Sequence, residues 1–236
     1  MSYNESSEVE YVKSFEQSVA TTVLKNVYLW MCAALAISGL TAMVVAKNPT
    51  ILSMIFANNF TVWGLLLAEL GLVWYLSSRI TKLSFSTAAI LYTVYSVLMG
   101  MTLSSIFLLY TMSSIANVFF ITAGTFGVIS LYGYTTKRDL SSWGSILLMG
   151  LVGLIIASVV NFFLNSEMLY WILSYVGVLI FVGLTAYDTQ KIKQMAISIA
   201  NDEEMGKKVA LMGALTLYLD FINLFLYLLR IFGDRD

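Results

Sequence analysis

The sequence contains no histidine, one cysteine, one proline and few charges. Without histidine there is no His-based zinc site or Ser-His-Asp triad, and with Cys32 alone there is no internal disulfide. Only 11% of the residues are charged, and the formal net charge is −1. The chain therefore has no basic field that would attract nucleic acid. Any chemistry must use carboxylates, hydroxyls, amides, Arg or Lys.

Apolar residues are present in excess. They make up 59% of the chain, and the mean hydropathy is +0.82. A soluble domain is about 45–50% apolar and about 25% charged, so this composition predicts an integral membrane protein. Strands of a membrane barrel alternate apolar with polar residues, whereas stretches such as 146–160 do not. The predicted fold class is therefore all-α.

The few charges mark the ends of the membrane spans, because a spanning helix needs about 20 apolar residues. The predicted spans lie between Lys25 and Lys47, at 58–78, as two helices between Lys82 and Lys137 with a turn at Thr111–Ser114, between Asp139 and Glu167, between Glu167 and Asp188, and between Lys208 and Arg230. The single proline, Pro49, falls between the first two spans and breaks neither. These seven spans form one membrane domain at 26–232, between a tail at 1–25 and a short tail at 233–236.

The distribution of Lys and Arg predicts the orientation of the chain. Ten of the 13 basic residues lie on the side that holds the N-terminus if all seven segments cross. Basic residues concentrate on the cytoplasmic side of membrane proteins. We therefore expect the N-terminus and the 1–25 tail in the cytoplasm and the C-terminus outside. A last segment that forms a re-entrant hairpin is the alternative, which segment length disfavours.

Three acids interrupt the apolar spans: Glu69, Asp188 and Asp220. A charge at the centre of a bilayer costs at least about 2.5–3.5 kcal/mol, so such residues face a bundle interior or a water-filled cavity. Each acid has a plainer interpretation as a satisfied structural hydrogen bond. Asp188 could also be an interfacial charge beside Lys191.

The last predicted span has a polar stripe. Thr216, Asp220 and Asn223 follow one another at helical spacing and share one face, while leucines occupy the others. A weaker stripe in the preceding span ends at Asp188. We therefore expect the two aspartates to lie within reach of each other.

Two adjacent carboxyl groups hold one proton between them more easily than two negative charges. The pair is thus a candidate pH sensor, and its oxygens are hard ligands of the kind that Ca²⁺ prefers. Glu69, Thr216 and Asn223 are candidates for lining a cation path. Arg79 is a candidate counter-ion for the pair, or otherwise an ordinary interfacial charge.

Two stretches resemble the signature of the Bax inhibitor-1 family, particularly its bacterial members. They are LTAYDTQKIK at 184–193 and LYLDFINLFLYLLRIFG at 217–233. The resemblance implies six helices around a central seventh, in the bacterial inner membrane. It also implies a pH-sensitive calcium leak that has calcium as permeant ion and no cofactor. Asp188 and Asp220 then act as the sensor, and an arginine of the second helix, here Arg79, can engage one of them. Some members of the family bind a membrane protease, and eukaryotic members suppress cell death.

Other functions fit parts of the same pattern. Aspartyl intramembrane proteases also use two aspartates, and Tyr187-Asp188 matches the first half of their motif. Leu217 and Leu219 occupy the glycine positions of their Gly-x-Gly-Asp motif, so we expect no enzyme. A proton-coupled cation transporter and a non-conducting regulator that binds other membrane proteins remain alternatives. Beyond the lipid bilayer, the expected partners are calcium, protons and other membrane proteins.

Overall fold

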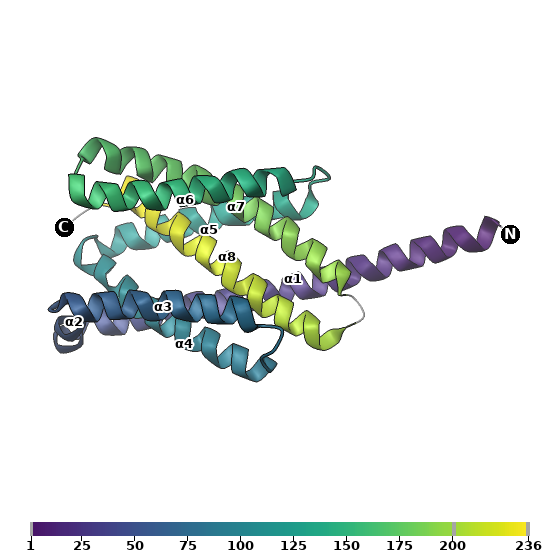
Figure 1. Cartoon of the computed structure of the whole chain (residues 1–236), viewed down its shortest axis with the longest axis horizontal. Helices are drawn as coiled ribbons and strands as arrows, with labels where there is room; N and C mark the ends of the chain where they lie inside the picture. Colours follow the sequence, from purple (N-terminus) through teal and green to yellow (C-terminus); the bar gives the residue numbers. More distant parts are fainter. Residues whose placement is uncertain (1, 200–201, 235–236) are drawn as a thin grey trace.

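The computed structural model describes residues 2–199 and 202–234 and is helical almost throughout. Figure 1 shows long helices that run side by side, with α1 projecting beyond the bundle at its N-terminal end. The elements are α1 Ser2–Ala46, α2 Pro49–Phe56, α3 Asn59–Arg79, α4 Phe85–Leu103, the 3₁₀ helix η1 Ser104–Leu108, α5 Met112–Thr135, α6 Ser141–Leu164, α7 Glu167–Ser198 and α8 Glu203–Phe232. Within the described residues, seven helices are long and apolar enough to cross a membrane, which confirms the predicted fold class.

Helix α8 occupies the centre of the bundle. About 67% of its most apolar window is buried inside the protein, compared with 11% for α3 and 6% for α6. It passes between α1 and α4 on one side and α5 and α7 on the other (Figure 1). The arrangement of six helices around a central last helix, implied by the family resemblance, is therefore present.

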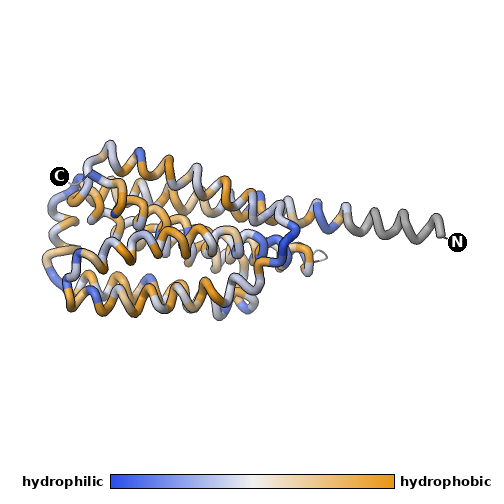
Figure 2. The backbone as a smooth tube through the Cα atoms, turned by 90° about the horizontal axis from the view of Figure 1, so that it is seen from above, coloured by the Kyte–Doolittle hydropathy of each residue, from blue (hydrophilic) through white to orange (hydrophobic). Residues whose placement is uncertain are grey.

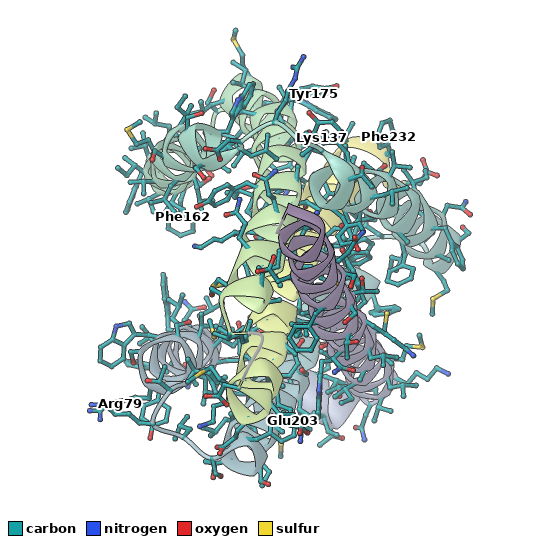
Figure 3. The ribbon with its side chains drawn as sticks, turned by 90° about the vertical axis from the view of Figure 1, so that its right-hand side faces the viewer. Arg79, Lys137, Phe162, Tyr175, Glu203 and Phe232 are labelled. Atoms are coloured by element: carbon teal, nitrogen blue, oxygen red, sulfur yellow. The ribbon has the colours of Figure 1, made fainter. Side chains whose placement is uncertain are left out.

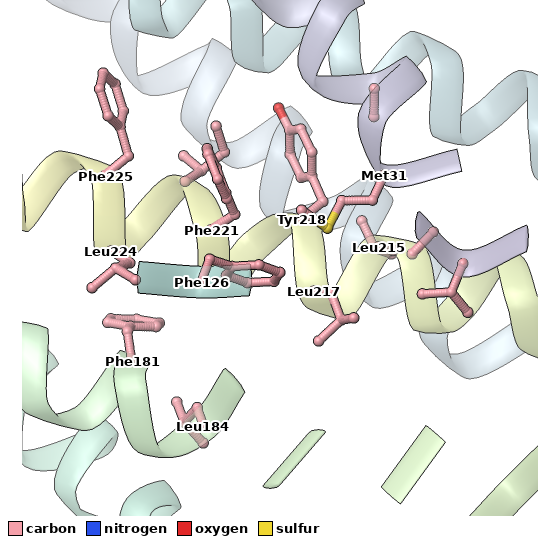
Figure 4. Packing of buried hydrophobic residues seen from close by; sticks show 14 of the residues in the cluster. Met31, Phe126, Phe181, Leu184, Leu215, Leu217, Tyr218, Phe221, Leu224 and Phe225 are labelled. Atoms are coloured by element: carbon pink, nitrogen blue, oxygen red, sulfur yellow. The ribbon is translucent and has the colours of Figure 1, made fainter. Parts of the chain in front are cut away.

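Aromatic side chains of α8 form much of the core (Figure 4). Phe221 packs edge-on against Phe126 of α5 at a centroid distance of 5.4 Å. Tyr218 packs edge-on against Tyr95 of α4 at 5.9 Å. Aromatic pairs of this kind contribute about 0.5–1.5 kcal/mol beyond their buried area. The apolar faces of α8 thus attach it to both halves of the bundle, and one face remains for polar residues.

Several boundaries differ from the prediction. Helix α1 runs unbroken from Ser2 through the predicted boundary at residue 25, so the segment before the first span is helical. The turn expected at Thr111–Ser114 is shorter, because Thr111 caps α5 by accepting a hydrogen bond from the Ser114 N–H. Asn48 similarly caps the short helix α2, which begins with Pro49 and was not predicted. Of the predicted C-terminal tail, residues 235–236 lie outside the described residues.

The last two helices extend past the predicted limits of their spans. Helix α7 continues ten residues beyond Asp188 to Ser198, and α8 begins at Glu203, where Asp202 caps it. Two ion pairs within the first turns of α8 join Lys207 to Glu203 and Lys208 to Glu204. Figure 2 shows hydrophilic residues gathered at the ends of the bundle and apolar residues between them. Asp188 thus lies within α7, well before its end, and Asp220 lies near the middle of α8.

Candidate functional site

A cavity of about 1630 Å³ lies along one face of α8. Side chains from α3, η1, α6, α7 and α8 line it. Figure 3 looks along the helices and shows α6, with Phe162, and α3, with Arg79, on either side of α8. Helix α3 packs mainly on α4, and α6 packs mainly on α7, so these two outer helices frame the cavity.

The two predicted aspartates meet in this cavity. Asp188 from α7 and Asp220 from α8 both line it, and they lie close enough for each carboxyl group to act on the other. Asp220 is only 4% exposed, and its Oδ2 has no hydrogen-bond partner among the described residues. Asp188 is half-buried and also experiences the charge of Lys191. The structure thus brings together the two aspartates that the polar stripes of the last two spans placed within reach of each other.

Small residues allow α7 and α8 to approach closely. A Cβ added to Gly177 of α7 would lie 2.7 Å from the ring of Tyr227 on α8. A Cβ added to Gly213 of α8 would lie 3.1 Å from Ile192 of α7. Small residues at helix contacts let backbones approach in membranes. This spacing brings the short side chains of Asp188 and Asp220 together.

The predicted stripe of α8 faces the same cavity. Thr216 and Asn223 both line it, one turn on either side of Asp220. Thr216 Oγ1 donates to the carbonyl of Met212 at 3.1 Å, and Asn223 Nδ2 donates to the carbonyl of Leu219 at 2.8 Å. Their acceptor capacity therefore remains available toward the cavity. Carboxylate, hydroxyl and amide oxygens are ligands suited to Ca²⁺.

The described residues contain no group of three or more His, Cys, Asp or Glu side chains that could hold a metal ion. Ca²⁺ takes six to eight oxygen ligands in its tight protein sites. The aspartate pair supplies at most four carboxyl oxygens, fewer than such a site uses.

Glu69 is buried elsewhere. It lies on α3, is 5% exposed, and accepts a hydrogen bond from Thr102 Oγ1 of α4 at 2.6 Å. It does not line the cavity that contains Asp188 and Asp220. The structure therefore places Glu69 apart from the predicted cation path, in the satisfied hydrogen bond that was the alternative interpretation.

Arg79 is also apart from the pair. It is exposed at the end of α3, points outward in Figure 3, and does not line the cavity. The cation whose charge acts on Asp188 is Lys191, one turn further along α7. In this arrangement Arg79 is not the counter-ion of the pair, because the end of α3 lies on the outside of the bundle.

A second polar cluster was not predicted. Ser38 of α1 donates to the carbonyl of Ser96 on α4 at 2.7 Å, and its Oγ lies 2.6 Å from the hydroxyl of Tyr218 on α8. The hydroxyl of Tyr92 is buried close by without a partner among the described residues. The signal in the sequence was tyrosine within apolar helices. Cys32 is exposed on α1.

The family model described as inhibitor of apoptosis-promoting Bax1 matches residues 20–236. The chain belongs to this family. It is 52% identical over 215 residues to the inner membrane protein YbhL of Escherichia coli (strain K12), covering 91% of this chain and 92% of YbhL. An uncharacterised protein of Borreliella burgdorferi is 48% identical over 212 residues, with coverage of 90% and 91%.

A third relative, the uncharacterised protein RP147 of Rickettsia prowazekii, is 46% identical over 223 residues, with coverage of 94% of this chain and 93% of that protein. These matches confirm the resemblance seen in the two signature stretches. The chain is thus a Bax inhibitor family membrane protein, and its relative in Escherichia coli bears the name of an inner membrane protein.

Proposed function

We propose that this protein is a passive, pH-sensitive calcium leak in the bacterial inner membrane. The aspartate pair gates the leak, calcium is the permeant ion, and no residue of the chain acts in catalysis. The observation that carries the proposal is the meeting of Asp188 and Asp220 in a large cavity, where Asp220 Oδ2 has no hydrogen-bond partner among the described residues.

The physical basis is the cost of two like charges at contact. A proton shared by the pair ties α7 to α8 through a hydrogen bond. Loss of that proton leaves two negative charges that either separate or attract a cation. Both responses change the contact between helices that line the cavity. Thr216 and Asn223 extend the polar surface on either side of the pair and support a path for a dehydrating cation.

Reconstituted protein tests the proposal directly. Liposomes containing a calcium dye should show passive calcium flux that changes with pH between 5 and 9, and Asp220→Asn should flatten this change. Asp139→Asn is the matched control. Asp139 lies between α5 and α6, and the hydrogen bonds from Ser141 lower its pKa, so it stays ionised throughout this range. Its replacement should leave the profile unchanged.

Two other outcomes would overturn the leak. Uphill accumulation of calcium driven by a proton gradient would indicate a proton-coupled transporter. Absence of flux from correctly folded protein would indicate a regulator that binds other membrane proteins.

The proposed N-terminal orientation can be tested separately, with a reporter at the C-terminus that is active only in the cytoplasm. Reporter activity would show that the last helix does not end outside.

A further inference from the structure

The cavity beside α8 is a lateral groove in a membrane protein. Exposed apolar side chains form its two edges, including Trp63 and Leu70 of α3 and Val159 and Phe162 of α6. Figure 3 shows these two helices flanking α8. Exposed apolar surface on a spanning helix faces lipid chains, so the groove opens toward the hydrocarbon of the bilayer. Its volume of about 1630 Å³ exceeds that of ordinary small-molecule sites, about 300–1,000 Å³.

One end of the groove is charged. Arg230, in the last turn of α8, is half-buried and lies over the rings of Tyr227 and Tyr170 at 5.1 and 5.7 Å. Glu167, one turn before Tyr170 in α7, lines the same cavity. Among the described residues, neither Arg230 nor Glu167 forms a salt bridge. A cation and an anion thus lie near the same mouth of an apolar groove without neutralising each other.

We propose that this groove binds an aminophospholipid, with the lipid phosphate on Arg230, the ammonium group toward Glu167 and an acyl chain along the apolar edges. The guanidinium group forms paired hydrogen bonds with phosphate oxygens. The site does not depend on ion conduction, so it stands whether or not the protein is a leak.

The charge pattern favours this occupant over others. A phosphatidylethanolamine head group carries a negative phosphate and a positive ammonium group. The mouth of the groove carries the positive Arg230 and the negative Glu167, so each group of the lipid has an opposite charge to pair with. Phosphatidylglycerol brings only the negative group and meets Glu167 unfavourably. Phosphatidylcholine brings a cation without N–H donors. A helix of another protein would fill the apolar edges but would leave Arg230 and Glu167 without matching partners.

Native mass spectrometry of the delipidated full chain tests the site, with phosphatidylethanolamine, phosphatidylcholine and phosphatidylglycerol added in equal amounts. We expect one phosphatidylethanolamine to be retained preferentially, and Arg230→Gln to weaken its binding about tenfold, as expected for loss of a charge-assisted contact. Arg138→Gln is the matched control. The first turn of α5 contacts the residue after the end of α8, near Arg230, through the hydrogen bond from Asp234 to Ser114. Arg138 is exposed and follows the opposite end of α5, so its replacement should have no effect.

A second variant covers the case in which Arg230→Gln fails to fold. Glu167 is exposed, so Glu167→Gln should fold, and it should abolish the preference for phosphatidylethanolamine over phosphatidylcholine. Phosphatidylethanolamine with brominated chains should also quench the fluorescence of Trp63 in the groove. Equal retention of the three lipids by the parent chain would overturn the proposal. So would undiminished binding by folded Arg230→Gln, or a preserved preference in Glu167→Gln.

Discussion

The two acidic sites of this bundle differ in what each carboxyl group faces. Glu69 meets the hydroxyl of Thr102 on the neighbouring helix and lies away from the cavity. Asp220 meets a second carboxyl group and faces a large cavity, and its Oδ2 has no hydrogen-bond partner in the described part of the chain. A buried acid with a neutral donor is a structural contact between helices. Two carboxyl groups in contact hold one proton between them more easily than two negative charges, which is the basis of the role proposed for Asp220. Burial alone therefore does not distinguish the two sites.

Replacement of each acid in turn gives the largest contrast. Asp220→Asn should reduce the change in calcium flux across pH 5 to 9 to less than about twofold, since the pair no longer shares a titrating proton. Glu69→Gln should keep the parent's profile. The measurement is dye-detected flux in liposomes with equal protein content. A flattened profile for Glu69→Gln and an intact one for Asp220→Asn would reverse the assignment of roles.

Removal of the hydroxyl that satisfies Glu69 should destabilise the protein without altering its pH response. Thr102→Val leaves the buried carboxyl without its donor, which costs about 1–3 kcal/mol. Thermal unfolding in detergent measures the loss. Thr93→Val is the control on the same helix, because Thr93 is exposed and its hydroxyl donates to the carbonyl of Ala89 within its own helix. Equal stability of both variants would show that the Thr102 contact contributes nothing.

The close approach of α7 and α8 can be tested at Gly177 of α7, which faces Tyr227 of α8. Gly177→Ala places a methyl group 2.7 Å from the Tyr227 ring and should cost about 1 kcal/mol, at the low end for overpacking because the ring edge can move. Gly153→Ala on α6 meets nothing within 4 Å and should be neutral or slightly stabilising. Comparison of the two melting temperatures gives the result. A larger loss for Gly153→Ala would contradict the proposed packing.

The smallest effect is expected at Cys32. Its side chain is exposed on α1, away from both acidic sites, so Cys32→Ser should leave calcium flux and its pH profile unchanged. Loss of flux at normal protein level would show that the thiol has a function outside the aspartate pair.

Patterns along single helices were sufficient to predict much of the fold and the central pair. The charges mark most span ends, because charged side chains avoid the hydrocarbon. The polar residues of α8 share one face at helical spacing, and a face of that kind cannot contact lipid. Asp188 and Asp220 could therefore be placed together. The two helices run past the charges that limit the predicted spans, α7 to Ser198 and α8 from Glu203.

Features that depend on which helices are neighbours could not be predicted in the same way. Glu69 is satisfied by Thr102 of another helix, and Arg79 lies on the outer side of α3. Neither fact is encoded in local spacing. The exposure of Cys32 could not be predicted either. Both the lipid-facing and the inward face of a membrane helix are apolar, so periodicity does not reveal which face is inside.

The most direct test of the central claim is a double-mutant cycle on the pair, measured as calcium flux across pH 5 to 9. Asp188→Asn and Asp220→Asn should each flatten the profile, and the double variant should add little, because two groups that share one proton act as a unit. Effects that simply add, or single variants that keep the parent's profile, would contradict a proton shared between Asp188 and Asp220.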